Sequence, residues 1–220
     1  MSNRSIETPL KYRMRESILN ENAPAIFFLH GYGSNMEDLF SLSQFFSDEW
    51  AIISFQASES IGFGGYAWAE LDFNNLRQLP KPEQKVDSIN NIHNSISALA
   101  SKFNFDKNQI YILGFSQGSD LALSTGFKFP NFYKGIISLC GYFDIKKVEY
   151  ELDHAALKNL NIFLSSAVYD NKVPVHLGRM TNLSLKKMGL TPTYFEYNTG
   201  HTISNECLTN VLDWLNLIKK

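Results

Sequence analysis

Short apolar runs alternate with longer helical patterns along this chain. A strand buried on both faces reads as a continuous apolar run, so these Ile- and Phe-rich runs predict the central strands of a mostly parallel sheet. Their alternation with helices is typical of βαβ units, and the sequence therefore predicts an α/β fold with helices on both faces of the sheet. The predicted strands cover residues 25–30, 51–55, 109–114, 135–140, 161–168 and 193–197.

The helices follow from apolar positions at three- and four-residue steps. Residues 83–103 show the clearest case, with one apolar stripe from Val86 to Phe103 that predicts an amphipathic helix. Residues 56–82 have no regular periodicity and carry several glycines and prolines, and long ordered loops of this kind are usually functional. Further helices are predicted over 36–46, 117–129, 175–188 and 205–218, and an alternating edge strand over 11–18.

No repeat, low-complexity tract or linker divides the 220 residues. This length suits one α/β domain with a sizeable core, so residues 1–220 are predicted to form a single domain. The segments between predicted strands are otherwise short, and we expect no large inserted lid.

Composition narrows the classes of partner. The 20 basic and 22 acidic side chains leave a formal charge of -2, which disfavours nucleic acid as a partner. Residues 1–16 lack the apolar core of a signal peptide, and no stretch approaches ~18 apolar residues, so we expect a cytoplasmic protein without stable membrane insertion. Cys140 and Cys207 lie far apart, outside any metal-binding pattern, and Cys140 is expected to be a buried thiol. The oligomeric state is not indicated.

The motif Gly114-Phe115-Ser116-Gln117-Gly118 fits G-x-S-x-G and stands between a predicted strand and a predicted helix. In this context a sharp turn pushes the serine out above the sheet, and the helix N-terminus faces a developing oxyanion. Taken alone, Ser116 fits equally well as an ordinary helix N-cap. The choice between nucleophile and cap depends on whether the chain also supplies a histidine base and an orienting carboxylate.

A serine hydroxyl needs a neutral imidazole to take its proton, and the imidazole needs a carboxylate to orient it. In this type of fold they follow the serine in the order Asp, His. His201 is the only histidine late enough, on a loop after the strand 193–197. The other four histidines stand where structural or solvated roles are more common: His30, His93, His154 and His176.

Asp170 is the preferred acid because it follows a buried strand. Asp144 comes one strand too early, and no strand precedes Asp153. As an alternative, Asp170 fits as an N-cap for the helix that begins near Pro174. Its alignment with the other two residues favours the catalytic interpretation.

Two further segments carry candidate site residues. In His30-Gly31-Tyr32-Gly33, a glycine-bearing turn after a strand is able to present backbone N–H groups to a substrate oxygen. The aromatic side chains of residues 56–82 are predicted to line an acyl pocket, with core packing as the alternative. They are Phe63, Tyr66, Trp68 and Phe73.

Together these motifs resemble the phospholipase/carboxylesterase family of the α/β-hydrolase superfamily, which includes acyl-protein thioesterases. The resemblance implies an α/β-hydrolase fold and a serine esterase that needs neither metal nor cofactor. It implies a Ser116-Asp170-His201 triad, an oxyanion hole from the backbone N–H groups of Tyr32 and Gln117, and Trp68 near the acyl site. Ser119 departs from the family, which often has a third glycine there. The segments that carry the resemblance are 28–33, 66–68, 114–118, 170 with 173–174, and 200–201.

The leading hypothesis is therefore a carboxylesterase or thioesterase that hydrolyses small acyl esters through an acyl-enzyme intermediate. A lysophospholipase is the nearest alternative within enzymes. A non-catalytic binding protein on the same fold is the alternative from another class, because a fold alone does not establish activity.

Overall fold

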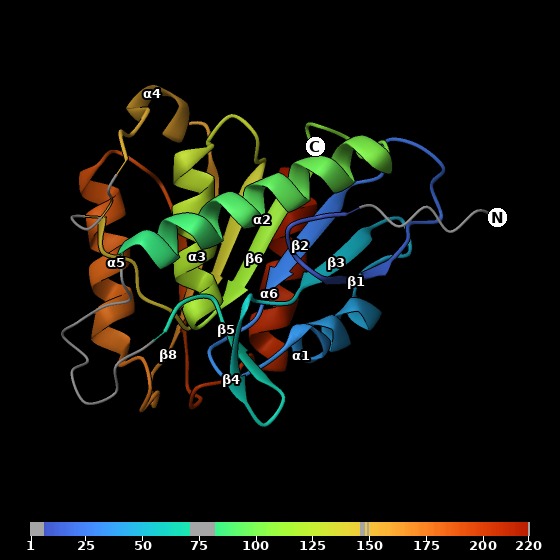
Figure 1. Cartoon of the computed structure of the whole chain (residues 1–220). Helices are drawn as coiled ribbons and strands as arrows, with labels where there is room; N and C mark the ends of the chain where they lie inside the picture. The colour runs from blue at the N-terminus through green and yellow to red at the C-terminus, as the bar shows by residue number, and fades with distance from the viewer. Residues whose placement is uncertain (1–6, 71–81, 146–147, 149, 220) are drawn as a thin grey trace.

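The computed structural model describes residues 7–70, 82–145, 148 and 150–219. A seven-stranded sheet in the order β1-β3-β2-β6-β7-β8-β9 runs through the molecule (Figure 1). The edge strand β1 is antiparallel to β3, and the other neighbours are parallel. The strands are β1 (Tyr12–Arg15), β2 (Ala25–Leu29), β3 (Ala51–Phe55), β6 (Ile110–Phe115), β7 (Gly135–Leu139), β8 (Asn161–Ala167) and β9 (Thr193–Tyr197).

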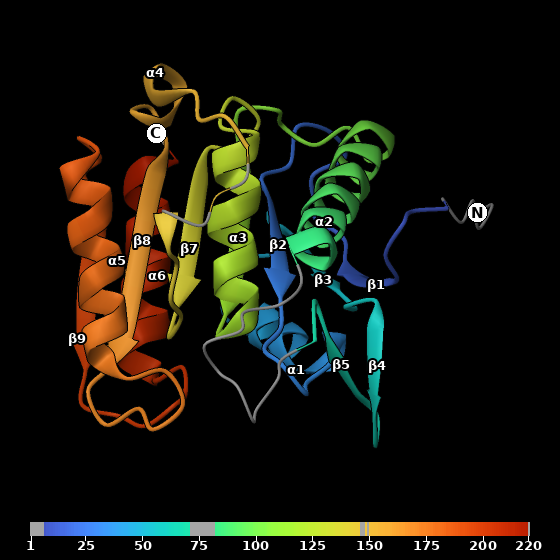
Figure 2. The ribbon, with the colours of Figure 1, turned by 60° about the vertical axis from the view of Figure 1, so that its left-hand side comes forward.

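Helices cover both faces of this sheet. Figure 2 shows α2, α3 and α5 on one face and α1 and α6 on the other. The first group is α2 (Pro82–Lys102), α3 (Gln117–Lys128) and α5 (Val175–Lys187), and the second is α1 (Met36–Phe40), the 3-10 turn η1 (Ser41–Phe45) and α6 (Asn205–Ile218). The short helix α4 (His154–Leu157) lies between β7 and β8 in the chain.

The two faces have separate apolar cores. Phe27 and Leu29 of β2 belong to the core beneath α2 and α3, whereas Ile26 and Phe28 belong to the core beneath α6. Successive strand side chains point to opposite faces, so a strand covered on both sides has to be apolar throughout. The continuous apolar runs in the sequence have this cause, and the predicted α/β architecture is confirmed.

Two segments differ from the sequence-based prediction. Residues 36–46 form α1 followed by η1 rather than one helix, and the Ser41 hydroxyl donates to the Asp38 carbonyl at the junction (2.6 Å). Such local bonds compete with continued α-helix. Residues 56–82 contain a hairpin that was not predicted, β4 (Glu59–Gly62) with β5 (Gly65–Ala67). All of β4 is exposed, so no alternation of apolar residues marks it.

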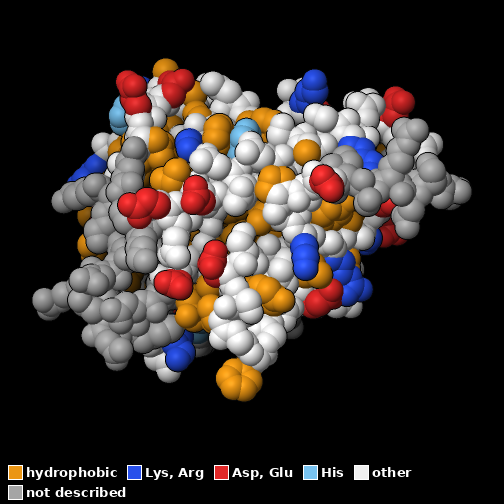
Figure 3. All heavy atoms as spheres, viewed as in Figure 1, with side chains coloured by type: hydrophobic (Ala, Val, Ile, Leu, Met, Phe, Trp, Pro, Cys, Tyr) orange, Lys and Arg blue, Asp and Glu red, His pale blue; other side chains and the backbone are white. Residues whose placement is uncertain are grey.

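One face of the molecular surface carries side chains of both charges. On the face shown in Figure 3, basic and acidic side chains are interspersed among apolar ones. Within the described ranges, no helix combines the length and apolarity needed to cross a bilayer.

The histidine of the longest helix is a structural residue. The His93 ring on α2 stacks on Phe129 with 3.6 Å between ring centroids, and its Nδ1 lies 3.0 Å from the Tyr133 hydroxyl. Burial, assisted by the nearby Lys128 ammonium, lowers the pKa of His93 to about 4. The imidazole therefore stays neutral in the folded protein at pH values where the unfolded chain already binds a proton.

This difference predicts a pH-dependent stability. As pH falls from about 6.5 towards 4, His93 binds a proton in the unfolded state but stays neutral in the folded state. Proton binding therefore stabilises the unfolded state, and the free energy of unfolding decreases. His93→Phe keeps the stack and removes the titration, and its free energy of unfolding should fall less between pH 7 and pH 5. Urea denaturation at both pH values measures this, with the exposed His154→Gln as control. An unchanged pH dependence in His93→Phe would contradict the assignment.

Candidate active site

Ser116 is the single residue between β6 and α3. Its backbone has φ 55° and ψ -116°, outside the regions that L-residues prefer, and its N–H donates to the Leu139 carbonyl at the end of β7 (2.9 Å). Strained backbone of this kind persists only where the surroundings enforce it. The turn pushes the serine side chain towards the carboxyl edge of the sheet.

The glycines beside Ser116 are required by close backbone contacts. A Cβ at Gly114 would lie 2.0 Å from the Gly118 carbonyl oxygen, and a Cβ at Gly118 would lie 2.1 Å from the Leu29 carbonyl oxygen. Both contacts involve backbone, which cannot move aside as a side chain tip can. The G-x-S-x-G spacing is therefore a packing requirement of the turn, and it brings the start of α3 against the end of β2.

His201 lies on the loop between β9 and α6 and links two residues that are distant in sequence. Its Nε2 is 2.9 Å from Ser116 Oγ, and its Nδ1 is 2.6 Å from Asp170 Oδ2. The Phe115 ring packs against the imidazole with 4.8 Å between centroids. The structure thus brings together the three residues that the sequence singles out, in the order Asp, His, Ser.

The carboxylate of Asp170 is fully buried and uses both oxygens. Oδ1 accepts the backbone N–H groups of Lys172 (2.8 Å) and Val173 (2.9 Å), while Oδ2 faces His201. Asp170 is not the N-cap of α5, because Pro174 holds that position and no side chain caps the helix. The carboxylate instead closes a turn before α5 through one oxygen and faces the imidazole with the other. Hydrogen bonds to both oxygens offset the cost of burying the carboxylate.

Backbone hydrogen bonds hold the loops of Asp170 and His201 side by side. The N–H of Val168 donates to the Tyr197 carbonyl (2.8 Å), and the N–H of Tyr169 donates to the Thr199 carbonyl (3.0 Å). These bonds extend the pairing of β8 with β9 beyond the two strands. The distance between the carboxylate and the imidazole is therefore set by backbone rather than by flexible side chains.

Tyr32 lies on the loop after β2, which is fastened to the hairpin. The Gly33 N–H donates to the Tyr66 carbonyl (2.9 Å), and the Tyr66 N–H donates to the Ser34 carbonyl (2.8 Å). A Cβ at Gly31 would lie 3.2 Å from Ser116 Cβ, so this loop passes directly beside the serine. Tyr32 and Gln117 consequently belong to the two backbone segments that flank Ser116.

His30 anchors the start of the same loop. The ring is fully buried, with Nδ1 2.8 Å from the Gly31 carbonyl oxygen and Nε2 accepting the Ala57 N–H (3.2 Å). Burial lowers the pKa of His30, so the neutral ring with a proton on Nδ1 satisfies both contacts. This is the structural role that the sequence suggested for His30.

The predicted acyl-pocket residues have different surroundings. Phe63 stands fully exposed at the hairpin tip, and the structure does not bring it to Ser116. Trp68 is only 1% exposed, and its indole N–H donates to the His30 carbonyl (2.8 Å), so it is placed as a packing residue and not as an open pocket wall. Tyr66 is half-buried beside the loop of Tyr32, and Phe73 lies outside the described residues.

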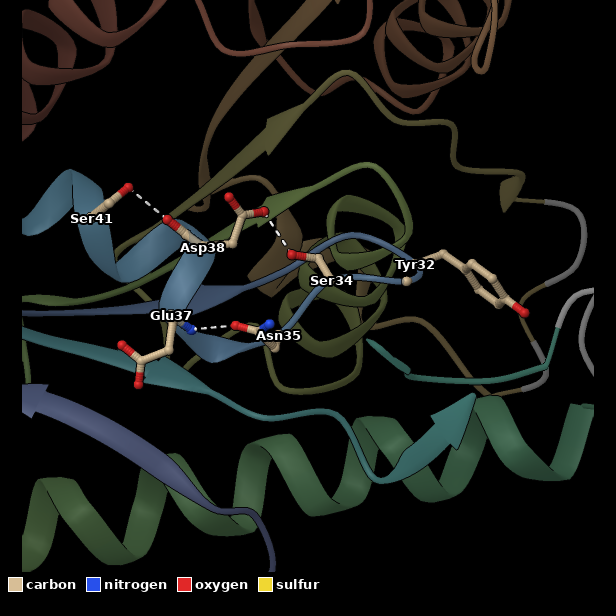
Figure 4. Close-up of a pocket in the computed structure, with 7 residues that line it drawn as sticks. Tyr32, Ser34, Asn35, Glu37, Asp38 and Ser41 are labelled. Carbon is tan, nitrogen blue, oxygen red and sulfur yellow. Dashed lines mark hydrogen bonds between the residues drawn. The ribbon is translucent and has the colours of Figure 1, made fainter. Parts of the chain in front are cut away.

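An open pocket of about 640 Å³ adjoins the Tyr32 loop (Figure 4). Its walls are mainly hydroxyl, amide and carboxylate groups, with Ser34 donating to Asp38 (2.7 Å), so it does not match the apolar acyl site expected from the sequence. Across the part of the chain that the structure describes, no group of three His, Cys, Asp or Glu side chains is arranged to hold a metal ion. The pocket is lined by Tyr32, Gly33, Ser34, Asn35, Glu37, Asp38 and Ser41.

Sequence reasoning missed the side chain of Gln117. Its Oε1 accepts the Trp68 N–H (3.0 Å) and its Nε2 donates to the Ala69 carbonyl (2.7 Å). A glutamine in the first turn of a helix gives no signal of such a distant contact. It ties the segment after β5 to the turn that carries Ser116.

Comparisons with known proteins agree with this architecture. A family model described as Phospholipase/Carboxylesterase matches residues 15–219. A probable carboxylesterase SOBER1-like protein of Arabidopsis thaliana is 26% identical, over 86% of this chain and 77% of its own length. Acyl-protein thioesterase 1 of Candida albicans is 24% identical, over 89% and 93%. The carboxylesterase structure of Bacillus cereus superimposes with a TM-score of 0.81 at 18% identity, covering 95% of this chain and 94% of that one. The fold is therefore the α/β-hydrolase fold.

The geometry predicts the tautomer of His201. Because Asp170 Oδ2 is an acceptor, the imidazole should carry its proton on Nδ1 and leave Nε2 as the acceptor for the Ser116 hydroxyl. Nitrogen-15 NMR of labelled protein at neutral pH should show this form for His201. In Asp170→Asn, the amide is expected to turn the ring to the Nε2–H form. An Nε2–H tautomer in the unmodified protein would contradict the assignment.

Proposed function

We propose that this chain, which belongs to the phospholipase/carboxylesterase family, is a serine hydrolase of carboxylic esters or thioesters. Membership of the family supports hydrolysis of esters. The observation that carries the finer proposal is the hydrogen-bonded series from Asp170 through His201 to Ser116. Nucleophile, base and orienting acid each stand within hydrogen-bond reach of the next, as nucleophilic catalysis requires.

In the proposed reaction the Ser116 hydroxyl attacks the acyl carbonyl while its proton passes to His201 Nε2. The imidazolium that forms is stabilised by the Asp170 carboxylate at Nδ1. His201 then gives the proton to the departing alcohol or thiol, which leaves an acyl group on Ser116 Oγ. Water attacks this acyl-enzyme with His201 again as base, releasing the acid and restoring the serine.

The tetrahedral intermediates place negative charge on the former carbonyl oxygen. We propose that the backbone N–H groups of Tyr32 and Gln117 bind this oxyanion, because they belong to the two segments that flank Ser116. The Gln117 N–H is also the first of α3, where the helix dipole favours negative charge. Fixed backbone donors require no reorganisation during the reaction.

The substrate is proposed to be a small acyl ester or thioester. An alcohol and a thiol are both possible leaving groups in this reaction, and the two relatives named above are a probable carboxylesterase and an acyl-protein thioesterase. A lysophospholipase would use the same residues, and release of fatty acid from lysophosphatidylcholine by purified protein would favour it. A binding protein has no need of the three aligned side chains. The cytoplasmic location and the single domain remain predictions.

Ser116→Ala should leave the fold intact and lower turnover of p-nitrophenyl esters by roughly 10⁶-fold, because the nucleophile is lost. The matched control is Ser124→Ala on the same helix, where a buried hydroxyl has no hydrogen-bond partner. That variant should keep full activity. A fluorophosphonate should label the unmodified protein at Ser116, which peptide mapping would locate. Retained activity in folded Ser116→Ala would rule out this nucleophile.

Asp170→Asn should lower kcat by about 10⁴-fold, because the imidazole would hold the wrong tautomer and lose its counter-charge. Asp153→Asn is the matched control, since the Asp153 carboxylate caps α4 through the Ala155 and Ala156 N–H groups. Steady-state kinetics on both variants, with Asp144→Asn as a third, would test the choice of acid. A larger loss in either control than in Asp170→Asn would show that the acid is misassigned.

A further inference from the structure

The indole of Trp68 connects directly to the β2 end of the site. Its Nε1–H donates to the His30 carbonyl oxygen (2.8 Å), and its ring lies 5.3 Å from the His30 ring between centroids. The same carbonyl oxygen would lie 2.7 Å from a Cβ at Gly118, so it is wedged between the indole and the start of α3. The indole therefore fixes the point from which the Tyr32 loop departs.

The backbone of Trp68 connects to the other side of the site. Its N–H donates to Gln117 Oε1, and the next carbonyl, that of Ala69, accepts from Gln117 Nε2. The carboxamide thus makes a two-point contact with one short segment. Because the amide side chain and the proposed oxyanion N–H belong to the same residue, the contact constrains where that N–H can lie.

The segment that makes these contacts is itself held firmly. Trp68 is 1% exposed, and its carbonyl accepts a hydrogen bond from Ser88 on α2. His30 is held in turn by the Ala57 N–H. Trp68 therefore stands at the centre of a rigid bridge between β2, α2 and α3, with no face of its indole open to a ligand.

We propose that Trp68 and the carboxamide of Gln117 are positioning residues, which together set the separation of the Tyr32 and Gln117 N–H groups. This inference rests on the proposed function, because it concerns the oxyanion hole of that same reaction. It replaces the acyl-contact role that the sequence suggested for Trp68. The residue acts on the reaction through two backbone donors and not through the substrate.

This role has a kinetic signature that a pocket wall would not have. Oxyanion hydrogen bonds strengthen in the transition state, so misplaced donors lower kcat and leave KM nearly unchanged. The loss is also the same for every acyl chain, because each substrate forms the same oxyanion. A residue that contacts the acyl group would change the preference among chain lengths.

The test compares Trp68→Phe and Gln117→Ala with Trp50→Phe. Trp68→Phe removes the indole donor and keeps an aromatic ring, while Gln117→Ala removes the carboxamide and keeps the backbone N–H. Trp50 is a matched control, since it is also buried (4% exposed) but packs on Phe46 and Tyr111 in the other core. Kinetics with p-nitrophenyl acetate, butyrate and octanoate, and thermal unfolding of each variant, give the readouts.

We expect each site variant to lower kcat by roughly 10- to 100-fold for all three esters with KM unchanged, the scale of a donor displaced by about 1 Å. Trp50→Phe should lose stability but keep kcat. The double variant should lose less than the product of the single losses, because both changes loosen one bridge. If Trp68→Phe does not fold, Gln117→Ala still tests the inference, because Gln117 is only half-buried. A lower kcat with unchanged KM in that variant would support the positioning role.

Two outcomes would overturn the inference: unchanged kcat in folded Trp68→Phe and Gln117→Ala, or losses that differ among the three esters and appear in KM. These are separable from failure of the proposed function. If the fluorophosphonate does not label Ser116 in the unmodified protein, the hydrolase proposal itself fails. If labelling and activity are intact, a negative result for the variants counts against the positioning role alone.

Discussion

The site depends on a close backbone contact between the start of α3 and the end of β2, which leaves no space for a side chain. Because a Cβ at Gly118 would lie 2.1 Å from the Leu29 carbonyl oxygen, the helix can approach the strand only if the residue after Gln117 is glycine. At the same place the Tyr32 loop passes beside Ser116, whose backbone is strained. Ser116 as the proposed nucleophile, both proposed oxyanion donors and the bridge through Trp68 all lie around this contact.

The acid side of the site is built on a different principle. Asp170 is a buried carboxylate, which is costly unless its oxygens are hydrogen-bonded. Lys172 and Val173 supply two backbone donors to one oxygen, so the carboxylate is held by contacts other than the one with His201. The imidazole then meets a fixed acceptor, and the β8–β9 backbone bonds maintain the distance. Positioning on the acid side thus rests on backbone donors, whereas the other side also uses the Trp68 indole and the Gln117 carboxamide.

The sheet could be predicted from the sequence because its central strands are buried on both faces and form continuous apolar runs. Ser116, Asp170 and His201 were candidates because each follows a predicted strand, and the structure brings their side chains within hydrogen-bond distance, although β9, the strand before His201, is only partly buried. The exposed hairpin had no such pattern, since β4 has no buried face. The sequence did not indicate that Phe63 would be exposed at the hairpin tip or that Trp68 would be buried. An aromatic side chain in a loop is equally consistent with a pocket and with packing, and only the contacts of Trp68 with His30 and Gln117 decide between them.

Ser119 shows how the turn accommodates a side chain where the resemblance leads one to expect glycine. Its hydroxyl is fully buried, accepts a hydrogen bond from Ser138 (3.0 Å) and fills the space above Gly141. A Cβ at Gly141 would lie 1.6 Å from the Ser119 hydroxyl oxygen, so the two positions share one volume. The absence of a side chain at Gly141 on the loop after β7 makes room for the serine on α3. The limit on side-chain volume therefore applies to positions 119 and 141 together. The strained turn at Ser116 tolerates a serine at 119 because residue 141 is glycine.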